Sequence, residues 1–134
     1  MTLRRKSREF ALQMLFEWDM AQQKPARIEQ HFWKSARAAD STRKFANQLF
    51  EGAVAEADAS DTLIAKLAEN WRLDRLAAVD RSILRMAIYE IRFATAPPKV
   101  VIDEALELAK KFSSAEAPSF LNGVLDAARK SLQT

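Results

Sequence analysis

The chain has 134 residues, of which 49% are hydrophobic, with 21 basic and 18 acidic side chains, one histidine, two glycines and no cysteine. This composition excludes disulfides, thiolate metal sites, a cysteine nucleophile and any site that needs two imidazoles. Two glycines are too few for a glycine-rich phosphate loop or for the turns of a many-stranded β fold, and no apolar run is long enough to span a membrane.

Apolar residues recur at spacings of three and four along most of the chain, which is the period of an amphipathic helix. The spacing predicts helices over residues 4–22, 28–39, 42–57, 60–70, 80–93, 100–112 and 119–132. Residues 71–79 are expected to form a short connector, and Asp40, Ser41 and Thr42 offer oxygens to cap the third helix. No stretch alternates long enough to predict a strand. We therefore expect an all-α protein of six or seven helices.

The helix stripes also predict a core. The side chains expected to be deeply buried are Leu84, Ala87, Ile88, Leu108, Val124 and Leu125. Gly123 interrupts the last predicted helix, where glycine costs about 1 kcal/mol relative to alanine. We expect a close helix–helix approach at Gly123 to offset that cost.

The charge is concentrated at the amino end. Four basic residues lie within positions 4–8 (Arg4, Arg5, Lys6 and Arg8), and the other 17 are balanced by the 18 acidic ones. A short basic block on a neutral body favours an anionic polymer as partner. A frayed, solvated terminus would explain the same charges, but the block runs directly into a helix pattern, which favours an ordered basic surface.

Polar and aromatic residues follow the block at helical spacing. Gln13 has a planar amide of the kind that reads base edges, and Phe16 and Trp18 carry rings that can stack on unpaired bases. Basic groups interleaved with aromatic ones are typical of single-stranded RNA binding. The two rings fit a hydrophobic core equally well, and the sequence leaves both interpretations open.

The acidic residues favour structural roles. Asp103, Glu104 and Glu107 lie near the start of a predicted helix, where the helix dipole favours negative charge, and no histidine accompanies them as a metal ligand. Glu90 follows the strongest apolar stripe, where a structural ion pair or cap is expected. We expect no metal ion, no cofactor and no catalytic residue.

Four segments resemble the NusB family of transcription antitermination factors. They are, in chain order, residues 4–16 from Arg4 to Phe16, residues 80–90 from Asp80 to Glu90, residues 99–110 from Lys99 to Lys110, and residues 120–126 from Phe120 to Asp126. Each motif alone is only fairly specific, but the order and spacing of all four match the family. Residues 22–70 match only in their helical pattern.

The resemblance implies one RNA-binding domain over residues 1–134, built from two packed helical subdomains, with no enzymatic activity. It implies binding of boxA-type ribosomal RNA leader sequence, together with the small-subunit ribosomal protein that acts as NusE. The pair would join the Nus complex on RNA polymerase in the cytoplasm. By position, the RNA-binding role falls on Arg4, Arg5, Lys6, Arg8, Gln13 and Phe16, and the partner-binding role on Asp80 and Glu116.

Two alternatives remain at this point. The same fold occurs as an amino-terminal domain of ribosomal RNA methyltransferases, so the chain could be an RNA-binding fragment of such an enzyme. It could also be a helical adaptor that binds protein without RNA, although the basic block argues against this. The sequence leaves both a monomer and a homodimer open.

Overall fold

The computed structural model describes residues 3–68 and 76–133, and all its regular elements are helices. Their bounds are α1 (Leu3–Ala21), α2 (Pro25–Ser35), α3 (Asp40–Ala55), α4 (Ala57–Leu67), α5 (Ala78–Phe93), α6 (Pro98–Phe112) and α7 (Ala117–Leu132). The all-α prediction with six or seven helices is confirmed. Most of the predicted connector at residues 71–79 lies outside the described residues.

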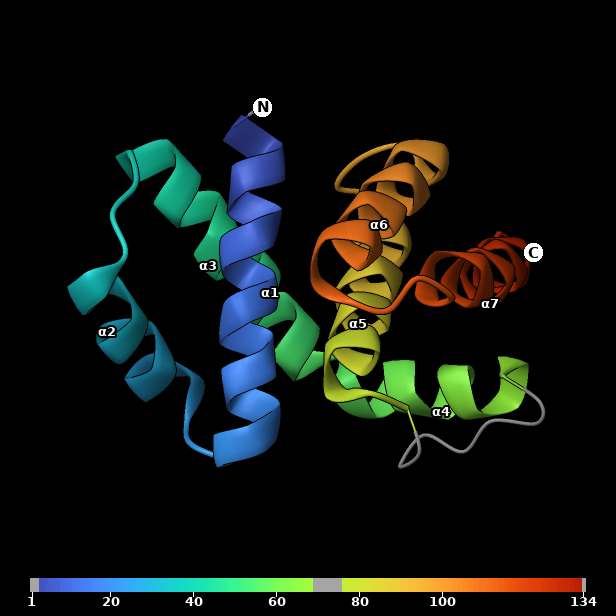
Figure 1. Cartoon of the computed structure of the whole chain (residues 1–134), viewed down its shortest axis with the longest axis horizontal. Coiled ribbons are helices and arrows are strands. Elements are labelled where there is room, and N and C mark those ends of the chain that lie inside the picture. Colours follow the sequence, from blue (N-terminus) through green and yellow to red (C-terminus); the bar gives the residue numbers. More distant parts are fainter. Residues whose placement is uncertain (1–2, 69–75, 134) are drawn as a thin grey trace.

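The helices form two groups that meet along α1 and α5 (Figure 1). Helices α1, α2 and α3 pack together, and α5 contacts α4, α6 and α7 as well as α1 and α3. Every side chain from Ser82 to Ile91 is buried, which makes α5 the central helix. All six side chains predicted to be deeply buried are at most 5% exposed.

Three prolines lie in the first turn of a helix. Pro25 and Pro98 are the first residues of α2 and α6, and Pro118 lies in the first turn of α7. Backbone amides in the first turn of a helix have no intrahelical acceptor, so proline, which lacks an amide hydrogen, is tolerated there. Helices α2, α6 and α7 therefore begin two or three residues earlier than their apolar spacing predicts. The predicted cap of the third helix is wrong: Ala39 occupies the cap position and gives no side-chain hydrogen bond.

The two glycines have opposite surroundings. A Cβ at Gly123 would meet nothing within 4 Å, so the predicted close approach at Gly123 is wrong. A Cβ at Gly52 on α3 would overlap the ring of Tyr89 on α5. The close approach of two helices is therefore at Gly52, where the missing side chain makes room for an aromatic ring.

Ion pairs connect α1 to α5 at both ends. Near the start of α1, Arg8 pairs with Glu90, whereas near its end Asp19 accepts hydrogen bonds from Arg81 at 2.6 Å and Arg85 at 2.8 Å. Burial acts to raise the pKa of Asp19, but the bonds from the two arginines outweigh it and hold the pKa below its ordinary value. The two helices thus run in opposite directions along a mostly apolar contact.

Candidate functional site

The first two turns of α1 divide their side chains between solvent and protein. Arg4 and Lys6 are exposed, while Ser7 and Arg8 are buried. Ser7 donates from its Oγ to the backbone oxygen of Thr42 at 2.8 Å, which holds the start of α3 against α1. The predicted basic block is therefore ordered and helical, but its members lie in different environments.

Arg8 differs from the expectation of an exposed phosphate ligand. Its side chain is 4% exposed, and its Nε and Nη2 donate to the two carboxylate oxygens of Glu90 at 2.9 and 2.8 Å. Burial acts to lower the pKa of Arg8, but the hydrogen bonds and charge of Glu90 outweigh it and raise the pKa. Thr95 donates to the same carboxylate at 2.7 Å. The sequence favoured a structural ion pair at Glu90, and the structure shows Arg8 as its partner.

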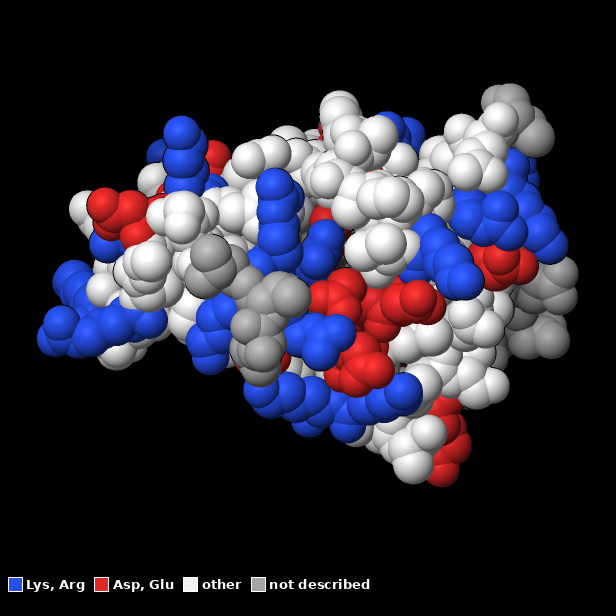
Figure 2. Space-filling model, turned by 90° about the horizontal axis from the view of Figure 1, so that it is seen from above, with Lys and Arg blue, Asp and Glu red and all other residues white. Residues whose placement is uncertain are grey.

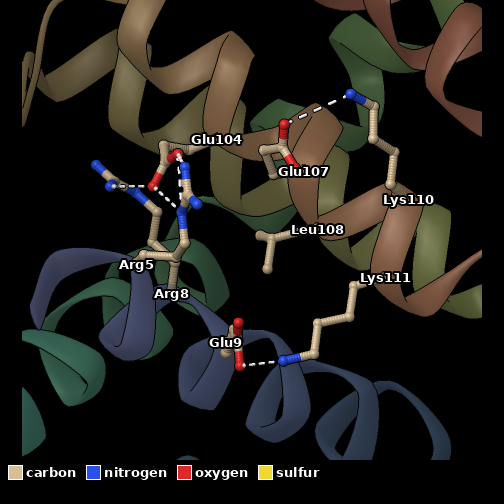
Figure 3. Close-up of a pocket in the computed structure, with 8 residues that line it drawn as sticks. All are labelled: Arg5, Arg8, Glu9, Glu104, Glu107, Leu108, Lys110 and Lys111. Atoms are coloured by element: carbon tan, nitrogen blue, oxygen red, sulfur yellow. Dashed lines mark hydrogen bonds and ion pairs between the residues drawn. The ribbon is translucent and has the colours of Figure 1, made fainter. Parts of the chain in front are cut away.

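Arg5 is half-exposed and reaches across to α6. Its Nη2 donates to Glu104 Oε2 at 2.6 Å, and this hydrogen bond is the largest cause that lowers the pKa of the Glu104 carboxyl. Figure 3 shows Arg5 and Arg8 converging on Glu104, and Lys111 reaching down to Glu9. These residues line a groove of about 260 Å³ between α1 and α6. Two of the four cations of the block, Arg5 and Arg8, are thus held in close ion pairs, and a third, Lys6, lies 4.0 Å from Glu9.

Gln13 and Phe16 lie on an exposed side of α1, at its third and fourth turns. Gln13 is exposed, and Phe16 is 42% exposed despite its large apolar ring. Trp18 is half-buried against the core, and the guanidinium carbon of Arg85 lies 5.7 Å from the centre of its ring. Of the two rings that the sequence could not assign, Phe16 is therefore free to contact a ligand and Trp18 belongs to the packing.

Asp80 and Glu116, far apart in the chain, line one groove. This groove has a volume of about 300 Å³ and is otherwise lined by Leu76, Ala77, Ser114, Ala117 and Phe120. Ser113 donates to Asp80 Oδ1 at 2.6 Å, which ties the end of α6 to the start of α5. The structure thus brings together two acidic residues that the sequence indicated separately, beside an apolar wall.

The start of α3 belongs to the same surface as the amino end of α1, which sequence reasoning missed. The Arg4 guanidinium carbon lies 4.0 Å from the ring centre of Phe45 on α3. Arg43 and Lys44, the two residues before Phe45 in the sequence, are exposed. The available signal was a basic pair followed by an aromatic residue, the same pairing of residue types as on α1.

Neither a metal site nor a membrane span is found in the part of the chain that the structure describes. No group of three or more His, Cys, Asp or Glu side chains there could hold a metal ion. None of the helices described combines the length and apolar character needed to cross a membrane.

Comparison with known proteins identifies close relatives. The model of the NusB family matches residues 5–130. The transcription antitermination protein NusB of Koribacter versatilis is 48% identical over 131 residues, which cover 96% of this chain and 90% of that protein. The corresponding protein of Symbiobacterium thermophilum is 44% identical, over 91% of this chain and 86% of its own.

Solved structures show the same arrangement of helices. NusB of Thermotoga maritima superposes with a TM-score of 0.85 at 31% identity, covering 95% of this chain and 90% of that one. A crystal structure of the antitermination factors NusB and NusE in complex with double-stranded RNA matches with a TM-score of 0.84 at 29% identity. The match covers 96% of this chain and 97% of that one.

Proposed function

The chain belongs to the NusB family, and on that premise we propose that it is an RNA-binding transcription antitermination factor. It recognises boxA-type ribosomal RNA leader sequence together with a ribosomal protein that acts as NusE, and the pair joins the Nus complex on RNA polymerase in the cytoplasm. It acts by binding and carries out no chemical step. The solved structure of related NusB and NusE proteins with double-stranded RNA supports binding of RNA together with a NusE-type partner.

The observation that carries the proposal is the set of exposed side chains on α1. Arg4 and Lys6 present positive charge to solvent, and Gln13 and Phe16 present an amide and a ring on the turns that follow. Cations attract phosphates regardless of sequence, whereas amides and rings contact bases. One helix therefore offers both kinds of contact. Arg5 and Arg8 contribute by holding this helix in place through Glu104 and Glu90.

Salt dependence of RNA affinity tests the phosphate role. Each phosphate contact on single-stranded RNA contributes about 0.7 to the slope of log affinity against log salt. Arg4→Gln/Lys6→Gln is therefore expected to reduce the slope by about 1.4 and to weaken a boxA-type RNA and a scrambled RNA of equal length alike. Lys66→Gln/Lys99→Gln removes the same charge from α4 and α6 and serves as the control. An unchanged slope in the first variant would show that the helix is a solvated surface, as the adaptor alternative requires.

Base recognition is tested separately at Phe16. Phe16→Ala is expected to keep the slope and to lose about 1–3 kcal/mol of affinity for the boxA-type RNA, because one stacked base is lost. The preference over the scrambled RNA should narrow. Because Phe16 is exposed, the melting temperature should hardly change. If Phe16→Ala keeps the full preference for the boxA-type RNA, Phe16 is not part of the RNA interface.

The groove at Asp80 and Glu116 is the proposed docking site for the ribosomal-protein partner. Its two carboxylates flank apolar side chains, which suits a basic partner with an apolar contact. Asp80→Lys is expected to weaken the protein complex at least tenfold in calorimetry, with the fold retained. The control is Ser113→Ala, which removes the hydrogen bond to Asp80 but keeps its charge. Equal effects of the two variants would indicate that Asp80 acts only within the fold.

A further inference from the structure

The cations of the amino-terminal surface fall into two sets. Arg5 and Arg8 are paired with carboxylates of α6 and α5. Arg4, Arg43 and Lys44 make no ion pair with any residue that the structure describes. Lys6 lies 4.0 Å from Glu9, and its side chain is 48% exposed. The charge available to an outside anion is therefore carried by α1 and α3, and not by the full basic block of α1.

Aromatic rings connect Lys6 on α1 to Arg43 on α3. The Lys6 ammonium lies 4.9 Å from the ring centre of Phe10, the Phe10 and Trp33 ring centres are 5.3 Å apart, and the Arg43 guanidinium carbon lies 5.2 Å from Trp33. Contacts with ring faces hold a cation in position and leave its charge in place. The cations at both ends of this series are thus positioned and remain able to bind a phosphate.

The side of α1 that faces α6 carries paired charges, because Lys110 lies 3.4 Å from Glu107 and Lys111 lies 3.0 Å from Glu9. Asp103 and Glu107 are exposed on α6 next to Glu104, which already accepts hydrogen bonds from Arg5. Figure 2, which views the molecule from above, shows acidic side chains gathered among basic ones at the centre and further basic side chains on both sides, including the side where α2 and α3 lie. A phosphate backbone that starts at the amino end of α1 therefore meets ion-paired side chains on the α6 side and cations without a described ion pair on the α3 side, so it is attracted more strongly toward α3.

We propose that Arg43 and Lys44 form, with Arg4 and Lys6, a continuous phosphate-binding surface that takes the RNA segment flanking the element bound along α1. This inference rests on the proposed RNA-binding function and gives the RNA a direction: from the exposed side of α1 across its amino end to the start of α3. The α3 contacts are made to phosphates, so they add affinity for longer RNA without adding sequence preference.

The test compares two RNAs and two matched double variants. One RNA contains the boxA-type element alone, and the other carries the same element with flanks of about six nucleotides. Arg43→Gln/Lys44→Gln removes one arginine and one lysine from the start of α3. Lys24→Gln/Arg27→Gln removes the same pair of residue types from the start of α2 and is the control. All these side chains are exposed, and melting temperatures verify that each variant is folded.

The wild type and the control are expected to bind the flanked RNA more tightly than the short one. The α3 variant should lose that gain, with the salt slope for the flanked RNA lower by about 1.4 and affinity on the order of tenfold weaker at 0.1 M salt. Arg43→Lys/Lys44→Arg, which keeps both charges, should bind like the wild type. Equal affinities of the α3 variant and the control for the flanked RNA would overturn the inference, as would an equal loss on both RNAs. A wild type that binds neither RNA would instead refute the proposed function.

Discussion

Replacing Arg8 by methionine would leave the Glu90 carboxylate buried without its partner. The pair is bidentate, and the two side chains are 4% and 2% exposed, so water cannot take the place of the lost guanidinium. Removal of one member of such a pair costs about 3–5 kcal/mol, a large part of the 5–15 kcal/mol that stabilises a typical domain. At this chain length the loss corresponds to a fall in melting temperature on the order of 10–20 °C. The double variant Arg8→Met/Glu90→Gln has no charge at either position and keeps an oxygen that can accept from Thr95. It should recover at least half of the lost free energy of unfolding.

Urea unfolding followed by circular dichroism measures both variants, and salt titration of RNA binding by the double variant measures the second consequence. Because Arg8 is buried, the double variant should keep the salt slope of the wild type. A loss below about 1 kcal/mol in Arg8→Met would refute the argument that the pair is structural. A slope lowered by about 0.7 in the double variant would mean that Arg8 itself contacts a phosphate.

Three further predictions concern packing and pH. Gly52→Ala should destabilise the protein by about 1–3 kcal/mol in urea unfolding, because its methyl group overlaps the ring of Tyr89. Gly123→Ala should stabilise it by up to about 1 kcal/mol, because the position is helical and open; the opposite order of the two variants would refute the packing described here. Burial, and then the nearby Glu51, raises the pKa of Glu29 from 4.5 to about 8, so its protonated form favours the folded state; stability should fall as the pH rises from about 4.5 to about 8 and level off above that. Glu29→Gln should flatten the pH dependence of the melting temperature between about pH 5 and 8, and an unchanged dependence would show that this carboxyl is not its source.

The helices could be predicted from the sequence because their apolar period is a local property. Residues such as Leu84 and Ile88 repeat at the spacing that a buried stripe needs, and both are fully buried. The close approach at Gly52 could not be predicted from the sequence. The sequence shows that a glycine lies in a helix, but it does not show which distant residue packs against that glycine. Gly52 faces Tyr89, 37 positions away in the sequence, whereas Gly123 faces open space.

The candidate site was predictable in its residue types and less so in their environments. The charge and aromatic pattern identified α1, and Arg4, Lys6, Gln13 and Phe16 are exposed as an interface requires. Arg8 has the same charge as its neighbours, and only the fold shows that Glu90, 82 positions away, neutralises it. The contribution of α3 depends on the contact between two helices, which no local pattern contains.

The ion pairs at the two ends of α1 have opposite polarity. Near its start α1 contributes the cation, Arg8, and near its end it contributes the anion, Asp19, to arginines of α5. If α1 were inserted the other way round, Arg8 would face those arginines and Asp19 would face Glu90, with like charges buried together. Apolar side chains tolerate either orientation, since dispersion contacts have no sign. The charges at the two ends of α1 therefore specify the direction in which this helix packs against α5.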